Sequence, residues 1–169
     1  MMTPYAIVTE SRTGNTALLG KRLREVLPQA DCLYEGRPSD EALAASVLFV
    51  GFWTDKGQAD AVSLAFLEKL HGKTVYLFGT AGFGVSEAYF QQIISRTKAV
   101  LTEDNTLAGS FMCQGRMPLS VRQRYEKQLA DQPDNAQLQE MIANFDQALD
   151  HPSADDLADL TQWAEKLTF

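Results

Sequence analysis

The stretch YAIVTESRTGNTALLGKRLREVLP, residues 5–28, decides the fold class of this chain. It opens with a short, mostly apolar run at 5–9 that is typical of a buried strand. A polar turn follows, and then leucine and valine side chains recur at helical spacing until Pro28 ends the pattern. A strand, a tight polar turn and a helix in this order form the repeating unit of parallel α/β sheets.

The same unit recurs through the first two thirds of the chain. Further apolar runs, each expected as a strand, lie at 31–34, 47–51, 75–79 and 107–112, with helical patterns between them. Because these runs are nearly continuous rather than alternating, both faces of the sheet should be covered by helices. We therefore expect a doubly wound α/β fold with a five-stranded parallel sheet. Its ligand should bind at the carboxyl ends of the strands, where the loops after Thr9, Gly51 and Gly79 meet.

The last third of the chain is less regular. Segment 114–150 carries two amphipathic helical patterns separated by a break at 131–135, and Ser153 then begins a last helix. A five-stranded doubly wound domain needs only one helix after its last strand. We interpret 114–150 as a helical insertion before that helix, and residues 1–169 as a single domain, in keeping with the chain length.

Composition narrows the classes of partner. Fifteen basic residues against 22 acidic ones give a net charge of −7. Such a surface repels phosphate backbones and anionic membranes, so no nucleic-acid or membrane partner is expected. It suits docking onto proteins with basic surfaces. The two cysteines, Cys32 and Cys113, and the two histidines match no metal-binding spacing, so no metal is expected. The N-terminus has no signal-peptide pattern, which favours a cytoplasmic protein.

The loop after the first expected strand has the composition of a phosphate site. Its six residues are Ser11, Arg12, Thr13, Gly14, Asn15 and Thr16. Three hydroxyl groups stand at the start of a helix, whose unpaired N–H groups and partial positive charge favour an anion. The loop contains neither GxxxxGK(S/T) nor GxGxxG, so neither a nucleoside triphosphate nor a pyrophosphate is indicated. Hydroxyl residues also serve simply as helix caps, but the position directly after the first buried strand favours the phosphate site.

The next two loops offer walls for a flat ring. They consist of Phe52, Trp53, Thr54, Asp55, Lys56 and Gly57 after the third strand, and of Thr80, Ala81, Gly82, Phe83 and Gly84 after the fourth. Aromatic rings from neighbouring loops can sandwich a planar heteroaromatic group, and small residues beside them allow close backbone contact. The competing interpretation is that Trp53 and Phe83 belong to the core.

The loop Ser11-Arg12-Thr13-Gly14-Asn15-Thr16 resembles the S/T-x-T-G-N-T phosphate loop of flavodoxins, and the resemblance covers about residues 4–113 and the last helix. It implies a flavodoxin-like sheet of order 2-1-3-4-5 and FMN as cofactor, with all the loop residues named above, 11–16, 52–57 and 80–84, as its site. Trp53 and Phe83 would be the two walls. The family usually keeps its phosphate site uncharged, so Arg12 departs from the pattern.

The resemblance also implies a role for the turn before Gly57. In flavodoxins the carbonyl preceding such a glycine accepts a bond from the flavin semiquinone, which assigns this role to the Lys56 carbonyl in a type II turn. An acidic surface disfavours adding negative charge to the flavin, so a low reduction potential is expected, opposed locally by Lys56 and Arg12. The implied function is a carrier passing low-potential electrons to a partner reductase.

Two alternatives remain open at this level. One is an NAD(P)H-dependent FMN or quinone reductase on the same fold. The other is a phospho-acceptor receiver domain using Asp55 and Thr80, although that class needs acidic residues after the first strand and a lysine after the last. Segments 51–57, 78–84 and 113–118 further resemble a bacterial subgroup of flavodoxin-like proteins, some of them associated with bilirubin reductases. Segment 113–118 is also a candidate rim for a partner or substrate.

Overall fold

The computed structural model describes residues 3–83 and 86–169. Its central sheet has the order β2-β1-β3-β5-β6, and a sixth strand, β4, pairs only with β3. The five main strands, all parallel, are β1 (Tyr5–Thr9), β2 (Cys32–Gly36), β3 (Val47–Asp55), β5 (Thr74–Ala81) and β6 (Thr106–Gln114). The expected five-stranded parallel sheet and its order, the first strand lying between the second and the third, are therefore confirmed.

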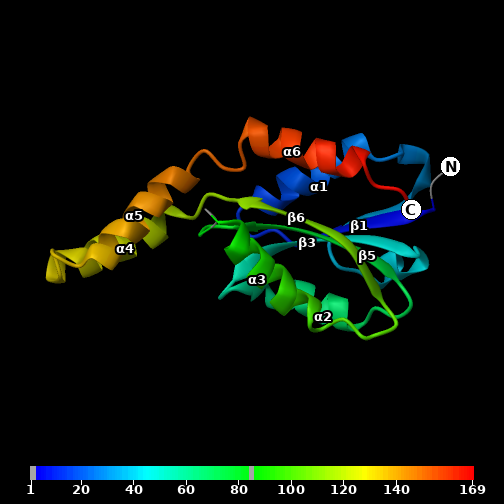
Figure 1. Cartoon of the computed structure of the whole chain (residues 1–169), viewed down its shortest axis with the longest axis horizontal. Coiled ribbons are helices and arrows are strands. Elements are labelled where there is room, and N and C mark those ends of the chain that lie inside the picture. Colours follow the sequence, from blue (N-terminus) through cyan, green and yellow to red (C-terminus); the bar gives the residue numbers. More distant parts are fainter. Residues whose placement is uncertain (1–2, 84–85) are drawn as a thin grey trace.

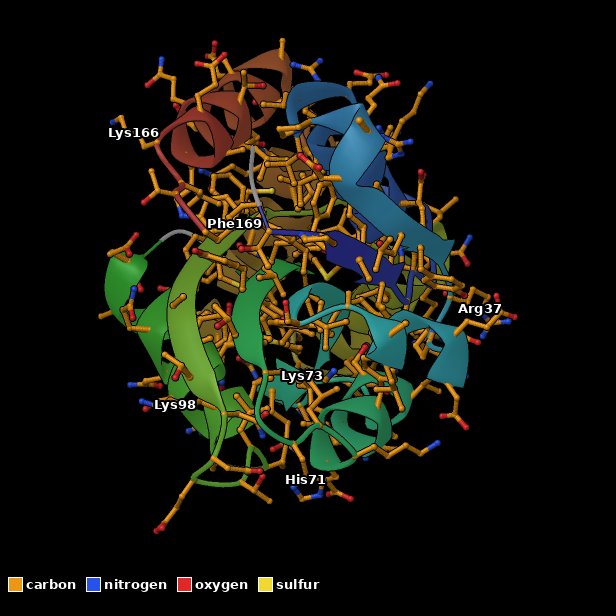
Figure 2. All side chains as sticks on the ribbon, turned by 90° about the vertical axis from the view of Figure 1, so that its right-hand side faces the viewer. Arg37, His71, Lys73, Lys98, Lys166 and Phe169 are labelled. Atoms are coloured by element: carbon orange, nitrogen blue, oxygen red, sulfur yellow. The ribbon has the colours of Figure 1, made fainter. Side chains whose placement is uncertain are left out.

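Helices cover both faces of the sheet, as expected. On one face lie α1 (Asn15–Val26) and α6 (Ala154–Glu165), and on the other lie α2 (Ala61–Glu68) and α3 (Glu87–Lys98) (Figure 1). Short 3-10 helices at Gln29–Asp31 and Asp40–Ala44 complete the connections around β2. Figure 2 looks at the end of the sheet where both termini lie and shows the three layers, with Arg37, His71 and Lys98 pointing outward.

The core divides into two clusters, one on each side of the sheet, because the side chains of a strand alternate between its faces. The cluster under α2 and α3 contains Phe52, Phe66 and Leu77. The cluster under α1 and α6 is built around Phe49, which is fully buried. The Phe49 ring stacks on Tyr76 at 4.8 Å between centroids and meets the edge of Phe169 at 5.6 Å. This aromatic packing ties the C-terminal segment to the middle of the sheet.

Segment 114–150, which we expected to be an insertion, contains a helical hairpin of α4 (Leu119–Asp131) and α5 (Ala136–Ala148). It projects beyond the sheet at the end opposite both termini, next to the carboxyl ends of the strands (Figure 1). Arg122 of α4 joins the two helices through Asp146, at 2.9 Å between Nε and Oδ1. The side chain of Asn144 on α5 donates to the Gly82 carbonyl at 3.0 Å and so attaches the hairpin to the end of β5.

One boundary differs from the expectation in a way that matters for the site. The strand predicted to end at Gly51 continues to Asp55 and turns back into β4 (Gln58–Ala59). Segment 52–55 is therefore strand rather than loop, and the strand period places Phe52 and Trp53 on opposite faces. Phe52 is fully buried in the core, whereas Trp53 is half-buried at the carboxyl edge.

Within the described residues, no helix combines the length and the apolar character needed to cross a membrane. Across residues 3–83 and 86–169, no three histidine, cysteine or acidic side chains come together as possible ligands of a metal ion.

Candidate functional site

The polar loop after β1 keeps donors free for an anion. The Ser11 hydroxyl oxygen accepts from the backbone N–H groups of Gly14 and Ala17, each at 3.2 Å. Gly14 adopts a φ of 91°, a conformation that glycine adopts without steric cost, and α1 begins at the next residue. The N–H groups of Asn15 and Thr16 find no acceptor within the described residues. The start of α1 therefore presents donors and the positive end of the helix to the carboxyl edge of the sheet.

Two of the predicted site residues, Thr16 and Thr80, use their hydroxyl groups inside the protein. The Thr16 hydroxyl donates to the Phe52 carbonyl at 3.0 Å and lies 3.1 Å from the Thr80 hydroxyl. Thr16 is fully buried and Thr80 is nearly so. These contacts connect α1, β3 and β5 directly below the site. Thr16 thus fixes the geometry of the loop through its side chain.

The three predicted loops meet at one small cavity of about 140 Å³. From the first loop come Arg12, Thr13 and Asn15, from the second Trp53 and Thr54, and from the third Thr80 and Gly82. The Thr54 hydroxyl is buried and has no hydrogen-bond partner in the part of the chain that the structure describes. Burying a hydroxyl without a partner is unfavourable, and this one belongs to a residue that lines the cavity.

Segment 115–118 and Val121 close the cavity from the side of the insertion. The Asn15 side chain donates to the Arg116 carbonyl at 2.7 Å, which attaches this segment to the first loop. A Cβ atom on Gly82 would lie 2.5 Å from the Met117 sulfur, so Met117 packs directly against the third loop. The composition of 113–118 indicated a possible rim, but only the folded chain shows that it contacts both loops.

The two predicted aromatic walls line different cavities. The Trp53 ring lies in the small cavity, with the Arg12 guanidinium 5.3 Å from its centroid. Phe83 is exposed and instead lines a larger groove of about 580 Å³, together with Ser86 and Tyr89 near the start of α3 and with Met141 and Asn144 of α5. The structure therefore does not bring Trp53 and Phe83 together around one space. Sequence reasoning missed the contribution of α5, because no local pattern shows where an insertion folds back.

The turn at Lys56 and Gly57 differs from the expected type II turn. Lys56 has a φ of 52° and Gly57 a φ of 82°, and Asp55 pairs with Gln58 across them. A two-residue hairpin with two positive φ angles is a type I′ turn, whereas type II requires a negative φ at the first position. The prediction of a type II turn was wrong, because the pairing of β3 with β4 imposes the twist that favours type I′. The role of the Lys56 carbonyl stays a prediction.

The remaining predicted residues lie at the edge of the site. Asp55 is half-buried at the end of β3, and Ala81 is a buried residue at the end of β5 whose carbonyl accepts from the Gly115 N–H at 3.0 Å. Phe52 reaches the site only through its backbone, since its side chain belongs to the core. Gly84 lies outside the described residues.

Asp60 anchors the strand that carries Trp53. Its carboxylate is almost fully buried and accepts from the Ser63 N–H at 2.9 Å, the Ser63 hydroxyl at 2.8 Å and the Trp53 N–H at 3.3 Å. Its own N–H donates to the Trp53 carbonyl at 3.0 Å. Burial raises the pKa of Asp60 above its usual value, and the bonds from Ser63 and Trp53 oppose that rise.

This raised pKa predicts a pH-dependent stability. Because the folded-state pKa of Asp60 lies above the unfolded value, its contribution to stability is fully present below the unfolded pKa and is lost as pH rises through the folded pKa. Asp60→Asn cannot ionise. Urea unfolding from about pH 3 to about pH 7 should therefore show the wild type losing stability relative to this variant. A constant difference across that range would contradict the assignment.

Comparison with known proteins places this geometry in a family. A family model described as a flavodoxin domain matches residues 6–165. A flavodoxin-like domain-containing protein BilS of Clostridium symbiosum is 40% identical over 172 aligned positions, covering 91% of this chain and 90% of that protein. A protein of the same name from Clostridioides difficile is 31% identical over 121 positions, covering 72% and 69%.

Solved structures agree in fold at much lower sequence identity. A short-chain flavodoxin associated with a bacterial microcompartment matches with a TM-score of 0.58 and 16% identity, over 98% of this chain and 95% of that chain. Oxidised flavodoxin 2 of Bacillus cereus matches with a TM-score of 0.57 and 14% identity, over 95% and 94%. The family model spans the sheet, the polar loop and the last helix, and with the relatives named BilS it leads to one conclusion: this chain belongs to the flavodoxin family.

Proposed function

We propose that this chain is a cytoplasmic electron carrier that binds FMN non-covalently and passes low-potential electrons to a partner reductase. Membership of the flavodoxin family supports FMN as the cofactor. The observation that carries the placement of the cofactor is the cavity at the carboxyl edge, where Asn15 at the start of α1 and Thr54 line the same space as the half-buried Trp53 ring.

These residues suit a flavin phosphate in chemistry. The start of α1 would hold the phosphate, and Trp53 would stack on the ring, since flat heteroaromatic rings pack well on indole. Gly82, which has no side chain, would let the ring approach the backbone of the third loop. Bound FMN supplies the redox chemistry, while these residues orient it and set its surroundings.

Space for the ring requires some side chains to move. Pockets for small organic ligands usually measure about 300–1,000 Å³, and the Trp53 cavity measures about 140 Å³. The side chains that fill the difference are Arg12, which covers Trp53, and Met117, which covers Gly82. Both are half-exposed or exposed and belong to long, unbranched side-chain types, so their displacement leaves the core intact.

The net charge supports the electron-transfer part of the proposal. At a net charge of −7, adding an electron to the bound flavin meets the repulsion of the whole surface, which favours a low potential. The same charge steers association with a partner that presents a basic docking surface, and such association should weaken as salt is added. The resemblance to the subgroup associated with bilirubin reductases makes a reductase the class of partner to test first.

The larger groove favours a second candidate function, an NAD(P)H-dependent FMN or quinone reductase. The groove of about 580 Å³ beside Phe83 is within the size range of small-molecule pockets and has two aromatic rings and a methionine in its lining. A flat substrate in this groove would lie next to the loop whose Gly82 lines the cofactor cavity.

The experiment begins with the colour of the purified protein. We expect a yellow protein from which acid releases FMN rather than FAD, as identified by chromatography. Under anaerobic conditions, NADPH alone should leave the flavin absorbance unchanged if the protein is a carrier and bleach it if the protein is a reductase. A colourless protein that takes up no FMN at micromolar concentration would contradict both functions.

A further inference from the structure

Two arginines without carboxylate partners converge on the Trp53 cavity. Arg12 comes from the first loop and Arg116 from the segment after β6, and both line the same space. Among residues 3–83 and 86–169, no acidic side chain lies within 4.0 Å of either guanidinium, as is also the case for Arg96 and Arg124, whereas Arg22, Arg24, Arg37 and Arg122 form ion pairs. Arg12 and Arg116 differ from Arg96 and Arg124 in lining the same cavity. In a chain with 22 acidic residues against 15 basic ones, two such cations at one cavity point to an anionic ligand.

The lining of the cavity agrees with this charge. None of the described residues that line it is acidic, and its polar residues include Arg12, Arg116 and Asn15 at the start of α1. Arg116 is held close to the first loop, because its carbonyl accepts from the Asn15 side chain and its N–H donates to the His151 carbonyl at 2.9 Å. The cavity therefore brings the start of α1 together with Arg12 and Arg116, two residues of a type whose guanidinium group is suited to binding a phosphate dianion.

Arg12 occupies the place where a ring would stack. Its guanidinium carbon lies 5.3 Å from the centroid of the Trp53 ring. A cation over an exposed aromatic face is held weakly, whereas a guanidinium bound to a phosphate forms strong, often bidentate hydrogen bonds. A phosphate at the start of α1 would therefore compete successfully with Trp53 for Arg12.

We propose that Arg12 and Arg116 form a phosphate clamp, and that phosphate draws Arg12 away from Trp53 so that a ring can stack there. This inference rests on the proposed FMN function and adds to it a basis for ligand selection. The site would discriminate in favour of flavins that end in a phosphate monoester and against riboflavin, which has no group to displace Arg12. Phosphate recognition in this chain would then depend on charge, unlike the uncharged phosphate sites that the family usually has.

Flavin titrations of the apoprotein test the clamp. Arg12→Ala should weaken FMN binding about tenfold to a hundredfold, because it removes a charge-assisted contact. The same variant should bind riboflavin as well as the wild type or more tightly, since the Trp53 face is then uncovered. Arg12→Lys should retain part of the preference, and Arg116→Ala should weaken FMN alone. Lys98→Ala, an equal charge change on an exposed residue at the far end of α3 (Figure 2), should change neither affinity.

The ratio of the FMN affinity to the riboflavin affinity, compared between each variant and the wild type, decides the outcome. A ratio that falls in Arg12→Ala supports the clamp. Equal losses for FMN and riboflavin would show that Arg12 merely supports the fold, and an unchanged ratio with unchanged affinities would show that it does not contact the phosphate. Raising the salt concentration should weaken FMN more than riboflavin, because screening acts on the charged contact.

A flavin-free measurement separates this inference from the proposed function. Inorganic phosphate should change the tryptophan fluorescence of the wild type as Arg12 leaves Trp53. The response should disappear in Arg12→Ala and in Trp53→Phe, where Trp163, half-buried on α6, is the tryptophan that remains. A protein that responds to phosphate but binds no FMN would retain the clamp and lose the proposed function. A protein that binds FMN but shows no phosphate response would retain the function and lose the clamp.

Discussion

Replacing Phe49 by alanine should lower the free energy of unfolding by about 3–5 kcal/mol, the usual cost of deleting a large buried aromatic side chain. Phe49 is fully buried in the middle of β3. Its ring contacts Tyr5, Tyr76, Trp163 and Phe169, which come from the sheet, α6 and the C-terminal segment. The resulting cavity would lie where these elements meet, and the site would lose the rigidity of the strand that supplies Trp53.

Urea unfolding of the apoprotein measures this loss. Leu33→Ala is the control, because Leu33 lies on edge strand β2 and is 55% exposed. Substitutions at such surface positions usually change stability by about 0.5 kcal/mol or less. Similar losses in the two variants would show that the Phe49 cluster does not hold the helix layer to the sheet.

The second large effect is expected at Trp53, the aromatic side chain on which we propose that the flavin ring stacks. Trp53→Ala should weaken FMN binding about tenfold to a hundredfold, since stacking of a flat base on an aromatic side chain is worth about 1–3 kcal/mol by alanine substitution. Trp53 is the one large aromatic side chain among the described residues that line the small cavity. Its removal also deprives Arg12 of the face that it covers.

Titration of the apoprotein with FMN, followed by quenching of flavin fluorescence, gives this affinity. Trp53→Phe preserves a flat apolar face and should retain most of the binding. Phe83→Ala tests the alternative wall, and a small effect there would agree with its place in the larger groove. If Trp53→Ala bound FMN as tightly as the wild type, the ring would have to lie elsewhere, and the groove beside Phe83 would become the first candidate.

The first loop shows what could be predicted locally. Residues 11–16 were expected to close a phosphate site, and the structure places them at the carboxyl edge with the Asn15 and Thr16 N–H groups free. The loop lies at this edge because a polar turn between a buried strand and a helix falls at the carboxyl ends of a parallel sheet, and its role as a phosphate site stays a prediction. The prediction did not foresee that the Thr16 hydroxyl points inward to Phe52 and Thr80, since those partners are distant in sequence.

The second loop shows where local reasoning was wrong. The apolar run from Val47 was expected to stop at Gly51, yet the strand continues to Asp55 and turns through Lys56 and Gly57. A lysine with positive φ is uncommon, so the hairpin had only a weak sequence signal. Two hydrogen bonds with distant residues support the hairpin. The Arg96 side chain donates to the Gly57 carbonyl at 3.3 Å, and the Ala59 N–H donates to the Thr97 hydroxyl oxygen at 3.0 Å.

The sequence by itself determined the fold class and the order of the five parallel strands, because apolar periodicity and turn chemistry act over a few neighbouring residues. The edge at which a ligand binds stays a prediction from the same patterns. Only the tertiary structure decided that Trp53 and Phe83 face different cavities, that α5 walls the larger groove, and that Arg12 lies on Trp53. These features arise from packing between segments up to about a hundred residues apart, as in the contact of Asn15 with Arg116. Such contacts depend on the shapes of the packed segments and on which donors and acceptors are still without a partner after each segment has folded. No local sequence pattern encodes either property.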